Sequence, residues 1–579
     1  MTAERLDVAH EAGVQMSHAE QATAEPRTAQ VTRPRGWRRL RRMSLTGAVL
    51  ATLAGWVTTT PSLVPRSWAV QLLLTGVTMA LGYGVGAFLG WAYRSLELPV
   101  APTRVRRVVW LALAVLAPLG LLVAGWLGRG WQQDQKLLLG LDAGVPPVWV
   151  LAPLLSAVLA ALLLALGRGV RWIGVRLYGL LGKRLRIPGR LAATIAVVVT
   201  ALLTWYVVSG VLVDNLLTAA DAAFAVRNDD NKPGVENPES PYRSGGPNSA
   251  VSWESIGREG RQFIWQGRTA ADVAEVTGAT DAVEPIRAFV GLEAADTATE
   301  RAQLAVEELR RLGGFDRSIL AVAGTTGSGW IDPKTAAALE FAAHGDVATV
   351  STQYSYLPSW LSFLMDRERA QANAEELLTA IRVELDTMPP DQRPKLYVYG
   401  ESLGAFSTGS AFTSVEDMST TTNGALLIGP PSFDVTWQRV QDNREPGSPL
   451  WRPDYDAGAL VRVASTPEQI TDPSLTWQTD NRIVYLVNSS DPIVAWTADR
   501  SAWLDPRGDD VLPQVQAIPV IGGLQASVDL FAANGVPAGH GHIYGDVSAT
   551  AWSEILGPPS LPAAEIDAIE EALVDINDP

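Results

Sequence analysis

The sequence of 579 residues contains no cysteine and only five histidines. Without cysteine the protein has no disulfide, no thiolate ligand for a metal and no cysteine nucleophile. His10 and His18 lie in a polar N-terminal tail, and His344 precedes Ser402, a serine discussed below. The other two, His540 and His542, stand in the glycine-rich segment 537–545, so a histidine base is sought there.

Charged residues are also absent from five apolar stretches in the first half of the chain. Most of these reach the roughly 20 residues that a helix needs to cross a bilayer. They lie at about 44–60, 67–93, 108–127, 146–167 and 191–213, and the first is the shortest. We predict a bundle of five transmembrane helices over residues 44–217, after a disordered, basic cytoplasmic tail at residues 1–43. Ion-coupled transport is disfavoured, because it generally needs ionisable groups at membrane depth.

The positions of Lys and Arg predict how these helices are oriented. A cluster of six arginines at 33–42 directly precedes the first stretch, and the second-to-third and fourth-to-fifth connections are also basic. The first-to-second connection has only Arg66, and the third-to-fourth only Arg129 and Lys136. Basic connections stay in the cytoplasm. The pattern predicts a multi-pass protein of the cell membrane, with the lipid bilayer as a partner, a cytoplasmic N-terminus and an extracytoplasmic C-terminal region.

The second half of the chain has the opposite charge. Residues 1–217 hold 22 Lys and Arg against 9 Asp and Glu (+13), which leaves 24 against 52 (−28) for residues 218–579. Such an acidic region would repel a phosphate backbone, so we expect no nucleic-acid partner. The sequence does not specify an oligomeric state.

Turn-forming residues at 218–250 form a predicted linker to a soluble domain, residues 251–579. In that domain strand candidates alternate with helix candidates. The strands are predicted at 286–292, 319–323, 348–353, 396–399, 425–428 and 483–487, and the helices at 297–312, 333–343 and 368–386. This alternation is typical of an α/β fold, in which helices cover both faces of a mostly parallel sheet.

The segment 395–409 contains Gly400-Glu-Ser402-Leu-Gly404 between a predicted strand and a run of small residues that continues as a helix. This pattern is typical of a nucleophile elbow. The serine must stand on a sharp turn with its Oγ exposed, and flanking glycines let strand and helix approach closely. The alternative is a strand-to-helix turn whose serine has no chemical role. A candidate acid and base further along the chain favour the chemical interpretation.

Acyl transfer by a serine needs a base and an acid that orients it. Asp491, after a predicted strand, is the candidate acid, and its alternative role is that of an Asp-Pro turn residue. The order Ser402, Asp491, His540 or His542 is that of α/β-hydrolases. Two histidines one residue apart also suggest a metal site, but neither cysteine nor a further histidine is available as a third ligand. We therefore expect no metal and no cofactor.

Backbone N–H groups must stabilise the oxyanion that forms in acyl transfer. One is expected from Leu403, directly after the serine. The other is expected from Thr325 or Thr326, in the glycine-rich loop 323–332 that follows an earlier strand. This loop lacks the Lys-Ser/Thr ending of a P-loop, so a phosphate-binding role is disfavoured.

Five segments resemble a known family: Gly324-Thr-Thr-Gly-Ser-Gly-Trp-Ile-Asp-Pro, Gln353-Tyr-Ser-Tyr-Leu-Pro-Ser-Trp-Leu-Ser-Phe-Leu, Gly-Glu-Ser-Leu-Gly, Gly429-Pro-Pro-Ser-Phe and Gly-His-Gly-His-Ile-Tyr. The family is one of actinobacterial, membrane-anchored α/β-hydrolases, and the resemblance covers nearly all of the chain after about residue 40. It implies a serine hydrolase and, by analogy, esterase or lipase chemistry on an acyl ester, with cell-envelope lipid as the candidate substrate. It also favours His542 as the base, because the family motif ends in Gly-His-x-Tyr.

Two points have alternative interpretations. The apolar, aromatic segment Tyr354–Met365 either packs in the core or forms an acyl-binding wall or lid turned toward the membrane. The protein either cleaves or transfers an acyl group through Ser402, or uses a hydrolase fold without turnover as a sensor or assembly module. Fluorophosphonate labelling discriminates between these functions, since only an activated serine reacts readily.

Overall fold

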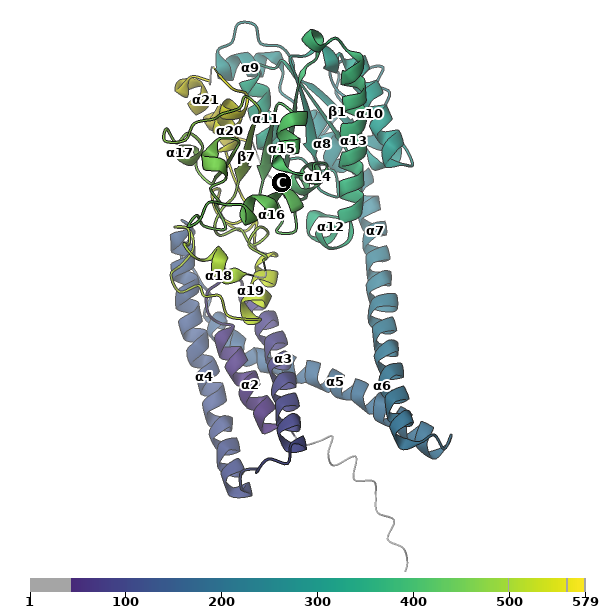
Figure 1. The fold of residues 1–579 in the computed structure, drawn as a ribbon, viewed down its shortest axis with the longest axis vertical. Coiled ribbons are helices and arrows are strands. Elements are labelled where there is room, and N and C mark those ends of the chain that lie inside the picture. Colours follow the sequence, from purple (N-terminus) through teal and green to yellow (C-terminus); the bar gives the residue numbers. More distant parts are fainter. Residues whose placement is uncertain (1–42, 498, 559–560, 577–579) are drawn as a thin grey trace, which may run out of the picture. The chain divides into compact units, whose positions relative to one another are not determined.

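The computed structural model describes residues 43–497, 499–558 and 561–576 (Figure 1). The predicted tail, residues 1–43, lies outside the described residues except for Met43. The N-terminal region consists of helices joined by short connections. They are α2 Leu45–Val57, α3 Trp68–Ser95, α4 Thr103–Leu138, η1 Pro147–Leu151, α5 Ala152–Lys183, α6 Gly189–Trp205, the π-helix η2 Tyr206–Val213 and α7 Asp214–Asp229.

Four helices of the described chain are long and apolar enough to cross a membrane, whereas the sequence predicted five. They are Trp68–Ser95, Thr103–Leu138, Pro147–Lys183 and Gly189–Val211. The correction concerns α2, the first predicted span, which has only 13 residues. At 1.5 Å per residue it is about 20 Å long, against a hydrocarbon core of about 30 Å.

The end of α2 has a local cause in three consecutive threonines, residues 58–60. Each hydroxyl donates a hydrogen bond to the carbonyl three residues earlier, at 2.7–2.9 Å. These bonds occupy carbonyls that a longer helix would use, and Pro61 has no N–H with which to continue it. The apolar stretch 44–60 therefore contains a helix end that its hydropathy did not reveal.

Seven strands form one sheet in the order β1-β3-β2-β4-β5-β7-β6, and all neighbours pair in parallel. The predicted parallel α/β fold is confirmed, and the predicted strands and helices agree with the structure to within about two residues. The short strand β6 was not predicted. The strands are β1 Ile286–Val290, β2 Ile319–Gly324, β3 Val347–Thr352, β4 Lys395–Glu401, β5 Gly424–Ile428, β6 Val461–Ala464 and β7 Arg482–Leu486.

Two groups of helices pack around the sheet. In one, α13 packs against α10 and α14, and in the other α11 packs against α20 and α21. The helices of the domain are α8 Arg258–Trp265, α9 Ala270–Thr277, α10 Ala298–Leu312, α11 Pro333–Ala342, α12 Ser359–Met365, α13 Arg367–Thr387, α14 Leu403–Ser410, α15 Val415–Thr421, α16 Val435–Asp442, α17 Pro467–Ile470, α18 Arg500–Trp503, α19 Ile521–Asp529, α20 Ser548–Ile555 and α21 Ala563–Val574.

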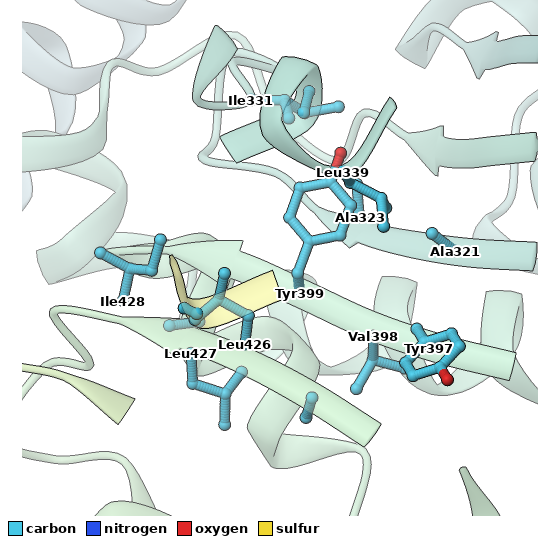
Figure 2. Close-up of a cluster of buried hydrophobic side chains, with 14 of the residues drawn as sticks. Ala321, Ala323, Ile331, Leu339, Tyr397, Val398, Tyr399, Leu426, Leu427 and Ile428 are labelled. Carbon is cyan, nitrogen blue, oxygen red and sulfur yellow. The ribbon is translucent and has the colours of Figure 1, made fainter. Parts of the chain in front are cut away.

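The core lies along the central strands, as Figure 2 shows for β4 and β5. Tyr397 and Tyr399 of β4 meet the ring of Trp552 edge-on, at centroid distances of 6.3 and 5.6 Å. Every residue of β1, β3, β5, β6 and β7 is buried. Such continuous burial is expected of a parallel sheet covered on both faces. The buried sheet holds the ends of its strands in place, and the candidate site lies at these ends.

Candidate active site

Ser402 stands at the turn between β4 and α14, as the elbow pattern predicted. Its φ of 58° and ψ of −122° lie outside the helical and strand regions, a conformation that costs roughly 1–3 kcal/mol and persists only where neighbours enforce it. A β-carbon at Gly400 would lie 2.3 Å from the carbonyl carbon of Gly404, so no side chain fits between strand and helix. The Ser402 N–H donates to the carbonyl of Ile428 at 2.9 Å, which ties the turn to the end of β5.

Asp491 follows β7 and has a fully buried carboxylate. Oδ2 accepts hydrogen bonds from Nδ1 of His542 at 2.7 Å and from the hydroxyl of Tyr544 at 2.5 Å. Oδ1 accepts from the N–H of Ile493 at 2.8 Å. Because a carboxylate only accepts, it selects the imidazole tautomer with the proton on Nδ1, which leaves a lone pair on Nε2.

The Nε2 atom of His542 is buried and, within the described part of the chain, has no hydrogen-bond partner. The ring lies against Gly429, where a β-carbon would be 2.6 Å from Cε1. Gly429 directly follows Ile428, whose carbonyl binds the N–H of Ser402. The ring therefore lies at the strand end that also holds the candidate nucleophile, and both side chains belong to buried residues, 6% and 4% exposed.

His540 contacts a different carboxylate. Its Nδ1 lies 3.7 Å from Oδ2 of Asp510, and its side chain is 27% exposed. Gly541 separates the two histidines with φ +51°, at a point where a β-carbon would lie 2.6 Å from a backbone carbonyl oxygen. This turn directs the two imidazoles to different partners, and the structure brings His542 to Asp491. No group of three or more His, Asp or Glu side chains suited to a metal ion occurs among the described residues.

Polar residues that the sequence analysis did not select hold the two loops together. Nδ2 of Asn488 donates to the carbonyl of Gly541 at 3.1 Å, and the Gly541 N–H donates to Oγ of Ser490 at 2.8 Å. The Ser490 hydroxyl in turn donates to the carboxylate of Asp510. Burial opposes ionisation of Asp510, but the nearby imidazole and serine hydroxyls outweigh it and lower its pKa. Asp510 lies in a loop without a motif, so no sequence signal marked it.

Tyr544 is a further residue of the site whose contact the sequence analysis did not predict. Its hydroxyl is the second donor to Asp491. Burial raises the pKa of Tyr544, and the charge of Asp491 raises it further, so the hydroxyl keeps its proton and remains a donor. The signal was present in the sequence, because Tyr544 ends the Gly-His-Gly-His-Ile-Tyr segment.

The predicted oxyanion donors lie around the elbow. Leu403 is the first residue of α14, so its N–H has no carbonyl within the helix to bind. Thr326 uses its N–H inside the loop, where it donates to the carbonyl of Trp330 at 3.0 Å. Thr325 lies beside the elbow, with its carbonyl carbon 3.7 Å from the position that a β-carbon of Gly404 would take. The geometry therefore favours Thr325 over Thr326 as the second donor.

Aromatic side chains connect α12 to the elbow helix. Phe363 of α12 meets Phe433 edge-on at 4.8 Å, and Phe433 meets Phe406 of α14 at 4.9 Å. Leu403 belongs to the same buried cluster. The inner face of the segment 354–365 is thus packed in the core, which was one of its two predicted roles, and it borders the candidate site.

The fold and these contacts define a hydrolase-type domain. A carboxylate–histidine pair lies at the carboxyl ends of its strands, and the strained Ser402 lies at the same ends. Comparison with protein families agrees with this class. Residues 286–569 match the model described as alpha/beta-hydrolase family, and residues 59–267 match the model of the N-terminus of that family. The chain therefore belongs to this alpha/beta-hydrolase family, in both its N-terminal and its hydrolase parts. No curated protein and no solved structure matched the chain.

Proposed function

We propose that the protein is a membrane-anchored serine hydrolase that cleaves or transfers an acyl group, with Ser402 as nucleophile, His542 as base and Asp491 as acid. One observation carries the proposal. Nδ1 of His542 is paired with a buried carboxylate at 2.7 Å, while Nε2 is unpaired at the strand end beside the elbow. This is the arrangement that acyl transfer by a serine requires.

In the proposed reaction, Nε2 of His542 takes the proton of Ser402 as Oγ attacks the carbonyl carbon of an ester. The N–H groups of Leu403 and Thr325 stabilise the negative charge that develops on the carbonyl oxygen. The imidazolium then gives its proton to the leaving alcohol as the C–O bond breaks, and the acyl group stays on Ser402. Water or an acceptor alcohol removes it by the same route, while Asp491 remains ionised and stabilises the imidazolium.

The substrate we propose is a lipid acyl ester, because apolar side chains are exposed next to the site. Trp360, Leu364 and Met365 of α12 are 54%, 58% and 50% exposed. The ring of Trp360 lies 6.3 Å from that of Phe531, which is 72% exposed. The inner face of α12 reaches Leu403 through the aromatic cluster. Exposed apolar groups in one patch favour contact with a lipid or a partner, and lipid-handling pockets are mostly apolar.

The orientation we propose places the hydrolase domain outside the cytoplasm. The support comes from the connections that contact this domain. Leu63, between α2 and α3, donates its N–H to Asp529, and Leu139, after α4, packs with Val536. The α3–α4 and α5–α6 connections instead adjoin the arginines at 94–107 and 184–190. Basic ends stay in the cytoplasm, so the domain at the other ends would be extracytoplasmic.

Ser402→Ala in the full chain tests the proposed reaction. The wild-type protein should react with a fluorophosphonate and hydrolyse p-nitrophenyl esters, and the variant should lose both activities while keeping its circular dichroism spectrum. Ser410→Ala, on the same helix, is the matched control and should keep both. A folded wild-type protein that neither reacts nor hydrolyses esters would favour the sensor or assembly module.

The lipid substrate is tested by comparing p-nitrophenyl esters from acetyl to palmitoyl. We expect kcat/KM to rise with acyl length. Trp360→Ser should lower it for palmitoyl more than for acetyl esters, because only a long chain reaches the exposed patch. Equal effects on both esters would argue against an acyl-binding role for α12.

A further inference from the structure

The connection between α2 and α3, residues 58–67 and here called the hairpin loop, packs against the hydrolase domain, and most of its residues are buried. Leu63 and Val64 are 0% exposed, and Leu63 belongs to the same hydrophobic cluster as the strands of the sheet. The Leu63 N–H donates to Oδ2 of Asp529 at 3.1 Å. Nε of Arg66 lies 3.7 Å from Oδ1 of the same carboxylate, and neither side chain of this pair is exposed. The hairpin loop therefore places a buried charge against α19.

The segment after α19 leads from this ion pair to the base loop, residues 536–543. The N–H of His542 donates to the carbonyl of Ala533 at 2.9 Å, and Ala533 lies four residues after the paired aspartate. Val64 packs in one buried cluster with Val536. Its Cγ1 also lies 3.5 Å from the position that a β-carbon of Gly541 would take. The hairpin loop thus contacts Asp529, at the end of α19 just before the base loop, and it also contacts the base loop directly at Val536 and Gly541.

Arg66 is also held from the membrane region. Its N–H donates to the side-chain oxygen of Gln132 on α4 at 2.6 Å, and its carbonyl accepts from Nε1 of Trp149 at 3.3 Å. A second contact also joins the hairpin loop to α19, because Gln525 of α19 donates to the carbonyl of Thr60 at 3.0 Å. The contacts of Arg66 with Gln132, Trp149 and Asp529 are all buried.

We propose that Arg66 and Asp529 are positioning residues, through which the hairpin loop holds the base loop so that His542 faces Ser402. The inference rests on the proposed function of His542 and extends it. The membrane region then supplies a structural part of the active site in addition to anchoring the chain.

The buried pair makes a specific pattern of effects expected. Removing one charge leaves the other buried without its ion-pair partner, whereas removing both restores the balance of charge between the two positions. Burial raises the pKa of Asp529, and the charge of Arg66 opposes that rise. Loss of Arg66 therefore favours the neutral acid and weakens its hold on the hairpin loop. Each single change should disturb the base loop more than the double change does.

The test uses the full chain in detergent or lipid nanodiscs, with Arg66→Met, Asp529→Asn and the double variant. The rate of fluorophosphonate labelling and the hydrogen exchange of the His542 amide are measured together. Each single variant should label at least tenfold more slowly and exchange at least tenfold faster, and the double variant should recover part of both changes. Should Arg66→Met not fold, Asp529→Asn carries the test, because its amide oxygen still accepts from Leu63.

Arg243→Met is the matched control. Arg243 is also a buried arginine with a carboxylate partner, Glu284 at 3.3 Å, but it lies beside β1, toward the opposite edge of the sheet from β7. Its loss should lower thermal stability and leave the labelling rate and the exchange of the His542 amide unchanged.

Labelling and exchange within twofold of wild type in both single variants would overturn the inference. Faster exchange without slower labelling would also overturn it, because the hairpin loop would then hold the base loop without positioning the base. Slower labelling without faster exchange would do the same, since the effect would not pass through the base loop. If the wild-type protein does not label at all, the proposed function fails, and unchanged exchange in the variants would then separately overturn the contact of the two loops.

Discussion

Replacing His542 by alanine should abolish turnover, whereas the same change at His540 should leave most of it. His542 contacts Asp491 through Nδ1 at 2.7 Å and has an unpaired, buried Nε2. Without this nitrogen no group takes the proton from Ser402. Loss of a general base in such a unit lowers kcat by about 10³-fold or more. At about 1.4 kcal/mol per tenfold, this corresponds to about 4 kcal/mol of transition-state stabilisation.

His540 should behave differently because its contact is longer and partly exposed. Its Nδ1 lies 3.7 Å from Asp510, and such pairs contribute about 1 kcal/mol or less. The loop keeps the hydrogen bond from Gly541 to Ser490, so His540→Ala should retain kcat within about tenfold. Hydrolysis of p-nitrophenyl butyrate by purified full-length variants measures both effects, with thermal unfolding as the check on folding. An inactive His540→Ala beside an active His542→Ala would refute the assignment.

Three further measurements test other parts of the structure. Gly429→Ala should lower kcat at least tenfold in a folded chain, because φ is +53° and a β-carbon would lie 2.6 Å from Cε1 of His542; an unchanged kcat would contradict this ring position. The pKa of Asp510 is lowered in the folded protein, so its stabilising contribution is present above the unfolded value of about 4 and is lost as pH falls through the folded one. Asp510→Asn should therefore lose less thermal stability than wild type between neutral and acidic pH, and parallel losses would count against the ionised carboxylate. Protease added to intact spheroplasts should digest the hydrolase domain, and a protected domain would exclude the proposed orientation.

The sheet was predictable because its signals are local. Buried parallel strands are short apolar runs, and here turn-forming residues and helices of ordinary length separate them. The elbow was predictable for a related reason, since a β-carbon at Gly400 would meet Gly404, four positions along the chain. Gly404 is required by a distant contact instead, because its β-carbon would lie 2.4 Å from the carbonyl oxygen of Gly324. The strand β6 was not predicted, because its four residues include Arg462 and give too short an apolar run.

Which of the two histidines meets Asp491 depends on the conformation of Gly541 between them. Alternation along an extended loop would place His540 and His542, two positions apart, on the same face, so it does not say which one meets the acid. The turn at Gly541, with φ +51°, and the hydrogen bonds from Asn488 and to Ser490 determine that His542 meets Asp491. These contacts join segments about 50 residues apart, and no periodicity in the sequence reports them.

The predicted number of spans was wrong because hydropathy does not report a local helix end. Hydropathy counts the stretch 44–60 as a membrane segment, although its threonines bond back to their own helix and end it. The contact of the hairpin loop with α19 was equally hidden. Leu63 and Asp529 are 466 positions apart, and Arg66 was only a single basic residue in a short connection.

Arg66 also bears on the proposed orientation, because it was one of the few basic residues on the side assigned to the exterior. In the structure it is buried against Asp529. The other two, Arg129 and Lys136, donate to the carbonyls of Val145 and Gly144 at 2.8–3.0 Å. The arginines at the opposite helix ends are exposed, and they include Arg94, Arg104, Arg106, Arg107, Arg184, Arg186 and Arg190. Positive charge held in contacts with the protein interacts less with lipid headgroups than exposed charge does, so the effective asymmetry is larger than the residue count and supports a cytoplasmic location for the arginine-rich ends.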